Sequence, residues 1–276
     1  MDLTQLAIEQ SIATMWSRYN EPLSLDEIAD TAILSKFYFS RVFRSMTGTS
    51  PGRFLSAIRL FNAKHLLLRT PLSVTEIAYM VGYNSLGTFT SRFTRSVGDS
   101  PGRYRSKSRA SGHALGGRPA GVGGGDGVGG CGEVSGSVVL PPGGGVVRTF
   151  VGLFANPLIE GRPVACAVLD GAGCYSLRGV PAGTWYVRAA AVGVGEVEAQ
   201  PWVRRPRLLG AGGEVTVAAG ARVGERVIGL RKVTILDLPV LLALPELDNW
   251  DLPGTTTVHH DTPTTDPMAV PPGAVR

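Results

Sequence analysis

Residues 50–54 read Ser-Pro-Gly-Arg-Phe, and fifty positions later residues 100–104 read Ser-Pro-Gly-Arg-Tyr. The similarity continues upstream, where Leu-Asp-Glu-Ile-Ala at 25–29 corresponds to Val-Thr-Glu-Ile-Ala at 74–78. Two phenylalanines four positions apart also recur, first as Phe39 and Phe43 and then as Phe89 and Phe93. A period of this length indicates one supersecondary unit used twice.

Each copy of the unit is predicted to be a helix, a tight turn and a second helix. Ser24 with Glu27, and Ser73 with Glu76, have the spacing of a capping box that starts the first helix. Turns are predicted at 33–35 and 82–84. The second helices follow, one carrying the apolar stripe Phe39, Val42, Phe43 and Met46 and the other covering 85–97, with Asn84 as candidate N-cap.

Further helices surround the two units. Ile8, Ile12 and Met15 recur at helical spacing and predict a helix over 2–19. Gly48 and Gly98 stand where a left-handed residue ends a helix. A long helix is predicted over 52–69, starting after Pro51, where a first helical turn accepts proline. Basic residues at 103–109 predict a basic tail.

Positive charge is concentrated on the repeated segment. Residues 1–110 contain 14 Lys and Arg against 8 Asp and Glu, an excess of six. The remaining residues contain 13 and 14, so the formal net charge of +5 comes from the first part of the chain. This asymmetry favours a nucleic-acid-binding domain beside a neutral one.

Several other classes of protein are disfavoured by composition. The apolar runs are shorter than the roughly 20 residues that a membrane span needs, and the first residues lack a basic, then apolar, targeting signal. Cys131, Cys166 and Cys174 have no metal-ligand spacing and no even pairing. We expect a cytoplasmic, nucleoid-associated protein with no catalytic residues, no metal, no cofactor and no membrane partner.

The second part of the chain changes in period. Residues 110–133 are rich in glycine and are predicted to be a flexible linker. Short Val-rich runs with near twofold alternation follow, at 136–140, 146–154, 164–169, 184–192, 215–217 and 226–235. They predict an all-β sandwich over 134–247. The Thr-, Pro- and Asp-rich segment 248–276 is predicted to be a disordered tail. The expected protein is multidomain, with an all-α domain over 1–109.

The second helix of each unit carries the residues expected to read DNA. A recognition helix needs an apolar rear stripe and small polar or basic side chains in front. Arginine can bind guanine through two hydrogen bonds, and Leu86 could meet a thymine methyl group. Phe39, Phe43, Phe89 and Phe93 are expected in the core. The candidate DNA-binding residues are Lys36, Phe37, Ser40, Arg41, Arg44, Asn84, Ser85, Leu86, Gly87, Thr88, Ser91, Arg92 and Arg95.

These residues carry a resemblance to a known family. "LSLDEIADTA" with "FYFSRVFRSMTGTSPGRF", and then "SVTEIAYMVGYNSLGTFTSRFTRSVGDSPGRYR", resemble the DNA-binding domain of AraC/XylS bacterial transcription regulators over residues 2–105. The resemblance implies seven helices, two helix-turn-helix units joined by a long central helix, and RNA polymerase as a partner. It also implies that the recognition helices enter successive major grooves of double-stranded DNA.

The chain departs from the family pattern at two positions. Family members often have glycine in the first turn, where this chain has Ile33, so a different local turn is expected. They also often have arginine where Ser91 stands in the second recognition helix, and Arg92 lies about 100° further around the helix. A base contact from the second unit is therefore less firmly predicted than one from Arg41.

The second part of the chain has a resemblance of its own. "GCYSLRGVPAGTWYVRAAAV" at 173–192 resembles carboxypeptidase-regulatory-like, transthyretin-like β-sandwiches. That resemblance implies a binding or interaction module, for an unidentified small-molecule or protein effector or for a homodimer.

The predicted function is a bacterial sequence-specific transcriptional regulator that is not an enzyme. Two alternatives stay open. One is a non-specific architectural DNA-binding protein. The other, more remote, is a DNA-repair alkyl acceptor that would use a cysteine such as Cys166, although that residue has no adjacent His or Arg to activate it.

Overall fold

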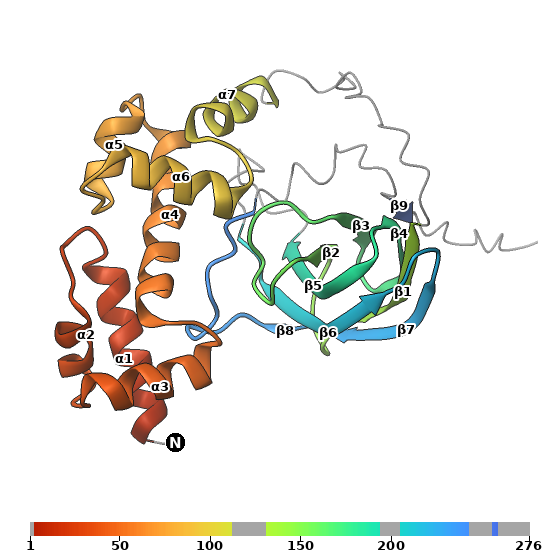
Figure 1. Ribbon diagram of the computed structural model, residues 1–276, viewed down its shortest axis with the longest axis horizontal. Helices are drawn as coiled ribbons and strands as arrows, with labels where there is room; N and C mark the ends of the chain where they lie inside the picture. The colour runs from red at the N-terminus through yellow and green to blue at the C-terminus, as the bar shows by residue number, and fades with distance from the viewer. Residues whose placement is uncertain (1–2, 112–130, 194–204, 243–255, 259–276) are drawn as a thin grey trace, which may run out of the picture.

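The helices gather on one side of the protein and the strands on the other (Figure 1). The computed structural model describes residues 3–111, 131–193, 205–242 and 256–258. Within these ranges seven helices precede all the strands. They are α1 (Leu3–Ser17), α2 (Leu25–Thr31), α3 (Lys36–Thr47), α4 (Pro51–Arg69), α5 (Val74–Met80), α6 (Leu86–Val97) and α7 (Pro101–Ser111).

The helix starts follow the predicted caps. The hydroxyls of Ser24 and Ser73 accept from the backbone N–H of Glu27 and Glu76, and both glutamates accept in return from the serine N–H at 2.7 Å. These backbone hydrogen bonds lower the pKa of both carboxyl groups. The predicted basic tail is helical instead: α7 starts after Ser100, whose hydroxyl accepts from the N–H of Arg103.

The turn inside each unit has the same backbone geometry in both copies, and here one expectation was wrong. Ile33 has φ +55° and Gly82 has φ +86°, so the first turn does not differ from the second. In both copies the next residue's N–H bonds back to an alanine carbonyl, Leu34 to Ala29 and Tyr83 to Ala78. Ile33 therefore occupies the left-handed region that disfavours β-branched residues, with its side chain 92% exposed.

Aromatic rings hold the second helix of each unit against the helix that follows it. Phe43 meets Phe54 of α4 at 5.5 Å between centroids and 90° between planes. Phe93 meets Tyr104 of α7 at 5.8 Å and 71°. Within α3 and α6 the two phenylalanines lie 5.4 and 5.6 Å apart. The repeated sequence thus forms a repeated core contact.

Helix α4 has buried residues from its first turn to its last and belongs to two hydrophobic clusters. Phe54 and Ile58 pack with α1, α2 and α3, whereas Leu60 and Leu67 pack with α5, α6 and α7. Arg59 of the same helix donates to the carbonyls of Tyr19 and Glu21, both at 2.7 Å. The helix therefore fixes the first unit relative to the second.

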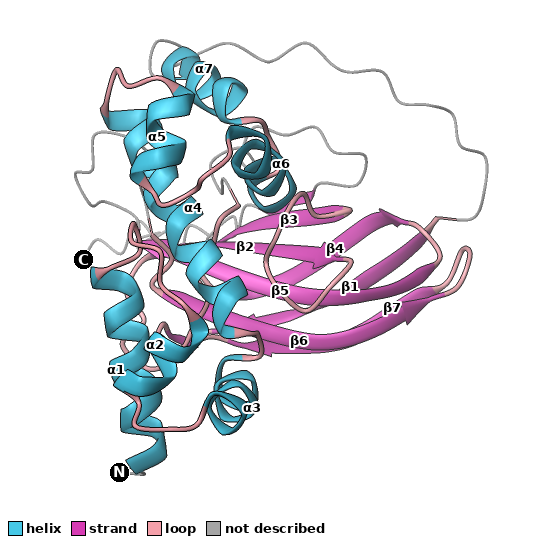
Figure 2. Ribbon diagram, turned by 60° about the vertical axis from the view of Figure 1, so that its left-hand side comes forward, coloured by secondary structure: helices cyan, strands magenta, loops and turns pink. Residues whose placement is uncertain are grey.

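The strands form two sheets that share one core. The three-stranded sheet has the order β4-β1-β7 and the six-stranded sheet the order β8-β6-β5-β2-β3-β9 (Figure 2). Side chains of both sheets meet in one cluster that includes Val134, Leu177, Val151 and Val187. The strands are β1 (Gly132–Val139), β2 (Val147–Phe154), β3 (Ala165–Asp170), β4 (Gly173–Val180), β5 (Gly183–Gly193), β6 (Leu208–Val217), β7 (Arg222–Gly229), β8 (Arg231–Lys232) and β9 (Thr256–Val258).

Several strands differ from their predicted limits, two of them strongly, and β4 lies outside the predicted runs. The run 226–235 was predicted as one strand, but the chain crosses from β7 in one sheet to β8 in the other at the buried residue Leu230. Strand β6 begins seven residues before the predicted Val215. Its glycines interrupt the apolar alternation that predicts a strand. A Cβ at Gly210 would come within 2.6 Å of Leu230. Close approach of the backbones therefore excludes the side chains that give strands their alternation.

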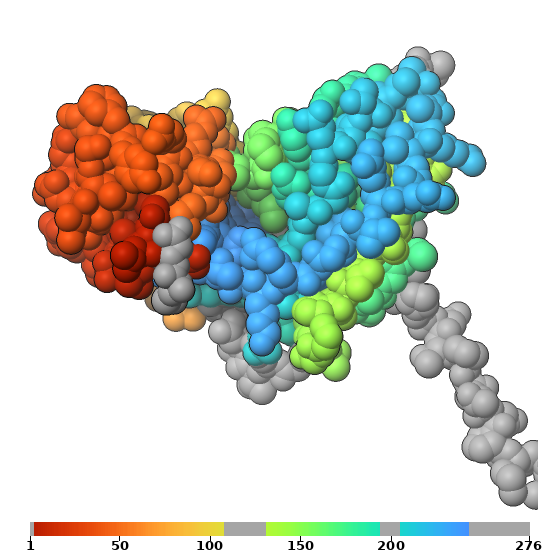
Figure 3. Space-filling model, turned by 90° about the horizontal axis from the view of Figure 1, so that it is seen from below, coloured from red at the N-terminus to blue at the C-terminus, as the bar shows by residue number. Residues whose placement is uncertain are grey.

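A segment after the last long strand joins the two parts of the molecule. We call residues 234–242 the strap; it is blue in Figure 3 and lies between the helices and the strands. Leu238 packs against both helical clusters, and Leu241 is buried in the second of them. Val240 and Leu242 pack on the outer face of the six-stranded sheet. Lys64 of α4, only 8% exposed, donates to the carbonyl of Leu241 at 2.7 Å.

The connection between β2 and β3 makes a second set of contacts with the helices. Glu160 pairs with Arg53 at the start of α4, at 2.5 Å. The N–H of Gly161 donates to the carbonyl of Ser96 at 2.9 Å. Arg162 donates to the carbonyl of Gly98 and pairs with Asp99, both at 3.1 Å. This connection is thus held against the start of α4 and the C-terminal end of α6.

Some predictions fall on residues outside the described ranges. The predicted linker 110–133 overlaps the end of α7 and the start of β1, and the part between them is not described. Within the predicted tail 248–276 the short strand β9 pairs in parallel with β3, and the rest is not described. In the described segments, no helix is both long and apolar enough for a transmembrane span.

Replacing Ile33 by glycine should stabilise the protein. A left-handed conformation costs an L-residue about 1–2 kcal/mol, and glycine removes this cost. Glycine also loses more conformational entropy on folding, which offsets about 0.5–1 kcal/mol of the gain. We expect a gain of roughly 0.5–1 kcal/mol in the free energy of unfolding, measured by urea denaturation. Ile33→Ala keeps the strain and serves as the control. A glycine variant less stable than the alanine control would show that the turn is not strained.

The strap should hold the two parts together after the chain is cut. A protease site placed within residues 112–130 should yield two fragments that still elute as one species in gel filtration. Leu238→Asp should separate them, because a carboxylate would be buried against both helical clusters. Ile235→Asp, an exposed position in the same segment, is the matched control. Separation of the unsubstituted fragments would refute this role.

His65 should make stability depend on pH. Burial, reinforced by Arg205, Lys64 and Arg69, lowers the pKa of His65 from 6.5 to about 4. The unfolded chain therefore binds this proton more readily, and stability is lost as the pH falls from about 6.5 towards 4. His65→Gln should reduce the drop in melting temperature between pH 7 and pH 5. An unchanged drop would mean that other groups account for it.

Candidate nucleic-acid interface

The solvent face of α3 carries most of the residues proposed for the first unit. Phe39 and Phe43 are fully buried on the opposite side. Phe37, Arg41 and Arg44 are exposed, and Ser40 is half-buried between them. Gly48 ends the helix with φ +74°. No acidic residue occurs in α3, so its free face is positive.

Tyr38 belongs to the same face, although it is not among the residues predicted to bind DNA. Its ring is 41% exposed, and the Arg41 guanidinium lies over it at 5.2 Å from the centroid. A cation–π contact of this kind orients the arginine without neutralising its charge. Tyr38 and Arg41 are one helical turn apart, which is the spacing that indicates such a contact. The position of Tyr38 also fits the apolar stripe, so the sequence does not distinguish the two roles.

The solvent face of α6 is built in the same way. Phe89 and Phe93 are buried, whereas Gly87, Thr88, Ser91 and Arg95 are exposed. Leu86 is 38% exposed at the first position of the helix. This helix also contains no acidic residue. The first turn of α6 therefore carries smaller and less basic side chains than the first turn of α3.

Four of the proposed side chains make contacts within the protein or lie outside the helix. Ser85, not Asn84, is the N-cap of α6, and its hydroxyl accepts from the N–H of Thr88. Asn84 lies exposed in the turn. Lys36 pairs with Asp26 at 3.2 Å, and Arg92 donates to the Ser56 hydroxyl at 3.3 Å. Ser56 is on α4, so Arg92 is directed towards the central helix.

Three basic residues of α7 have structural partners. Arg105 donates to the carbonyls of Leu67 and Leu72, at 3.0 and 2.6 Å. Lys107 and Arg103 pair with Asp99, whose side chain is 3% exposed. Part of the positive charge of the helical domain thus stabilises its own fold, and α3 and α6 retain the exposed arginines.

The β part leaves both of these faces accessible. Its contacts with α3 involve Met46 and Thr47, and its contacts with α6 involve Arg95 and Ser96, all at the C-terminal ends. The contact at Arg95 is through its backbone carbonyl. The exposed side chains listed above for the first two turns of each helix remain open to solvent.

Comparison with known proteins identifies the helical part. A protein family described as "Helix-turn-helix domain" matches residues 28–107. The "HTH-type transcriptional activator RhaS" of Enterobacter sp. (strain 638) is 35% identical over 104 residues, which is 38% of this chain and 37% of that protein. The "Uncharacterized HTH-type transcriptional regulator YobQ" of Bacillus subtilis (strain 168) is 33% identical over 95 residues, 34% of this chain and 39% of that protein.

Among solved structures, the DNA-binding domain of AdpA, described as "the global transcriptional factor, in complex with a target DNA", is 32% identical with a TM-score of 0.37. The match covers 38% of this chain and 94% of that one. The chain thus spans less than two-fifths of these curated relatives. The family match, at 28–107, lies in the helices. The helical part of this protein is a helix-turn-helix domain over residues 28–107, similar to the domains of these bacterial transcriptional regulators.

Proposed function

We propose that this protein is a bacterial sequence-specific transcriptional regulator that places α3 and α6 in two successive major grooves. One observation carries the proposal: the same helix-turn-helix geometry occurs at both ends of α4, and each copy presents an exposed, acid-free helix. Helix α4 has 19 residues and is about 28 Å long. This is comparable with the roughly 34 Å repeat of DNA.

The proposed roles follow from the contacts of each side chain. Arg41, exposed and oriented by Tyr38, is the candidate for reading guanine. Arg44 and Arg95 are candidates for phosphate contacts, since they are exposed at the ends of their helices. Leu86, at the start of α6, is the candidate for a thymine methyl group. Lys36, Ser85 and Arg92 act mainly on the fold, through the partners described above.

The β part is proposed to be a β-sandwich that senses an effector or binds another protein. RNA polymerase is the partner on which such a regulator acts. A homodimer is not required by geometry, because two units in one chain can already occupy two grooves. The repair alternative is disfavoured by Cys166, which is 1% exposed beneath the strap, whereas an alkyl acceptor must be reached by its substrate.

Selection of binding sites from random duplexes, with affinities measured at two salt concentrations, tests the proposal. The full chain should select a bipartite motif with centres about 10 base pairs apart. Enrichment of no motif, together with a steep salt dependence, would favour the architectural alternative.

Arg41→Ala should weaken binding to the selected site by about 1–3 kcal/mol and relax the preference at one base pair. Arg178→Ala, an exposed arginine on β4, is the matched control and should leave the affinity unchanged. Uniform weakening over all sequences would instead make Arg41 a phosphate contact.

Leu86→Ala should reduce the preference for one A·T pair by weakening binding only to duplexes that carry that pair. The lost contact is with a thymine methyl group, so discrimination falls at that pair while the phosphate contacts remain. The same selection experiment measures it, and an unaltered motif would contradict the role of Leu86.

A further inference from the structure

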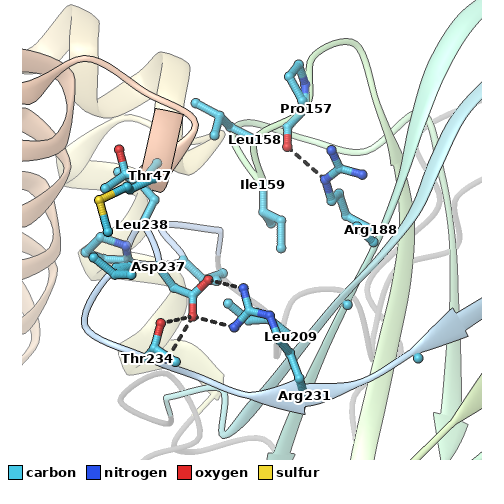
Figure 4. Close-up of a pocket in the computed structure, with 17 residues that line it drawn as sticks. Thr47, Pro157, Leu158, Ile159, Arg188, Leu209, Arg231, Thr234, Asp237 and Leu238 are labelled. Atoms are coloured by element: carbon cyan, nitrogen blue, oxygen red, sulfur yellow. Dashed lines mark hydrogen bonds and ion pairs between the residues drawn. The ribbon is translucent and has the colours of Figure 1, made fainter. Parts of the chain in front are cut away.

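A cavity of about 550 Å³ lies where the helices meet the strands (Figure 4). Met46 and Thr47 of α3 form one wall, and the β2–β3 connection and strand β6 form another. The strap closes a third side with residues from Thr234 to Val240. The volume falls within the roughly 300–1,000 Å³ typical of small-molecule sites.

Apolar side chains make up most of the cavity wall. Ile159 points into the centre of the space, with Leu209 and Leu238 around it (Figure 4). All three are only partly buried, although each packs on a hydrophobic cluster. Part of their apolar surface is therefore still available to a molecule that fills the cavity, which favours a ligand with an apolar body.

Arg188 of β5 supplies a charge at one side of the cavity. Its Nε donates to the carbonyl of Pro157 at 2.8 Å, and its Nη1 to that of Val187 at 2.9 Å. Both acceptors are neutral, and no carboxylate of the described residues pairs with this guanidinium. Burial lowers the pKa of Arg188. A half-buried cation held in place by neutral carbonyls keeps N–H groups for an anion.

The other charges of the cavity are balanced. Arg231 binds both carboxylate oxygens of Asp237, at 2.6 and 2.7 Å. The backbone N–H and the hydroxyl of Thr234 donate to the same carboxylate, at 2.7 and 3.0 Å. Burial alone would raise the pKa of Asp237, but these donors hold it below its usual value. Because Arg231 and Asp237 neutralise each other, Arg188 gives the cavity lining a net charge of +1.

We propose that this cavity binds a small monocarboxylate with an apolar body, its carboxylate on Arg188 and its body against Ile159, Leu209 and Leu238. The wall contributed by Met46 and Thr47 would bring the ligand to the C-terminal end of α3, one turn beyond Arg44. A molecule that contacts both parts stabilises their docked arrangement and so orders α3 for DNA. This last step rests on the proposed function; binding itself does not.

Calorimetric titration of the full chain tests the site without DNA. The probes are sodium octanoate and sodium 3-phenylpropionate, each compared with its alcohol, octan-1-ol or 3-phenylpropan-1-ol. At least one carboxylate should bind, about tenfold or more tightly than its alcohol, because a charge-assisted hydrogen bond is lost in the alcohol. Absence of binding by both carboxylates, or equal binding of acid and alcohol, would overturn the proposal.

Three variants locate the binding. Arg188→Gln should weaken carboxylate binding about tenfold or more by removing the charge. Ile159→Trp should abolish binding of acid and alcohol alike by filling the space. Arg178→Gln, an equally basic residue on the opposite sheet, should leave binding within twofold. Thermal melting checks that each variant folds. Unchanged affinity in both Arg188→Gln and Ile159→Trp would place the binding elsewhere and refute the site.

Affinity for the selected duplex then tests the link to DNA. Saturating carboxylate should raise it about fivefold, within the usual range of coupling between sites, and should have no effect in Arg188→Gln. If carboxylate binds but no duplex is selected, the regulator proposal fails and the site stands. If a duplex is selected but no carboxylate binds, the carboxylate site is refuted and the regulator proposal stands.

Discussion

The burial of α4 is the constraint on which the rest of the structure depends. Ten of its residues are buried, and eight of these, all apolar, are divided between the two helical clusters. A surface helix has one apolar stripe, whereas a helix that is apolar on most sides must be enclosed. Enclosing α4 requires one unit at each end and the strap along a remaining side. The positions of α3 and α6 are consequences of this arrangement.

The strap makes the molecule one connected body in the part that is described. Its side chains alternate between the helical clusters and the outer face of the six-stranded sheet, so both surfaces are covered by the same few residues. The ion pairs of Glu160 and Arg162 add orientation to this apolar contact. The carboxylates of these pairs, Glu160 and Asp99, are 8% and 3% exposed, so the pairs fix the docking geometry beside the leucines and the buried Lys64.

The repeated unit shows how one geometry tolerates different sequences. Gly82 suits its left-handed turn and also its surroundings, since a Cβ would lie 3.0 Å from the carbonyls of Asn20 and Tyr19. Ile33 adopts the same conformation where the side chain projects into solvent. The second turn thus needs glycine because of the limited space as well as the positive φ. In the first turn, Ile33 has room for its side chain and is disfavoured only by its backbone conformation.

The sequence by itself determined the local and repeated features. Capping serines, left-handed glycines and phenylalanines at helical spacing act over a few residues, and so the helices of both units were predictable from Ser24, Gly48 or Phe39. The exposed faces of α3 and α6 followed from the same period. Local signals could not decide between Asn84 and Ser85 as the N-cap of α6, because both residue types are favoured at that position. The backbone conformation of the folded turn places Ser85 there.

Tertiary structure alone decided which polar groups meet. Lys64 and the strap are separated by about 177 residues along the chain, and no pattern in either segment reveals the other. The same holds for Asp99 with Arg162, for the glycine-rich strand β6, and for the cavity that Arg188 shares with α3. These features arise where surfaces from distant segments come together, because their energies depend on burial and on partners that the linear sequence does not specify.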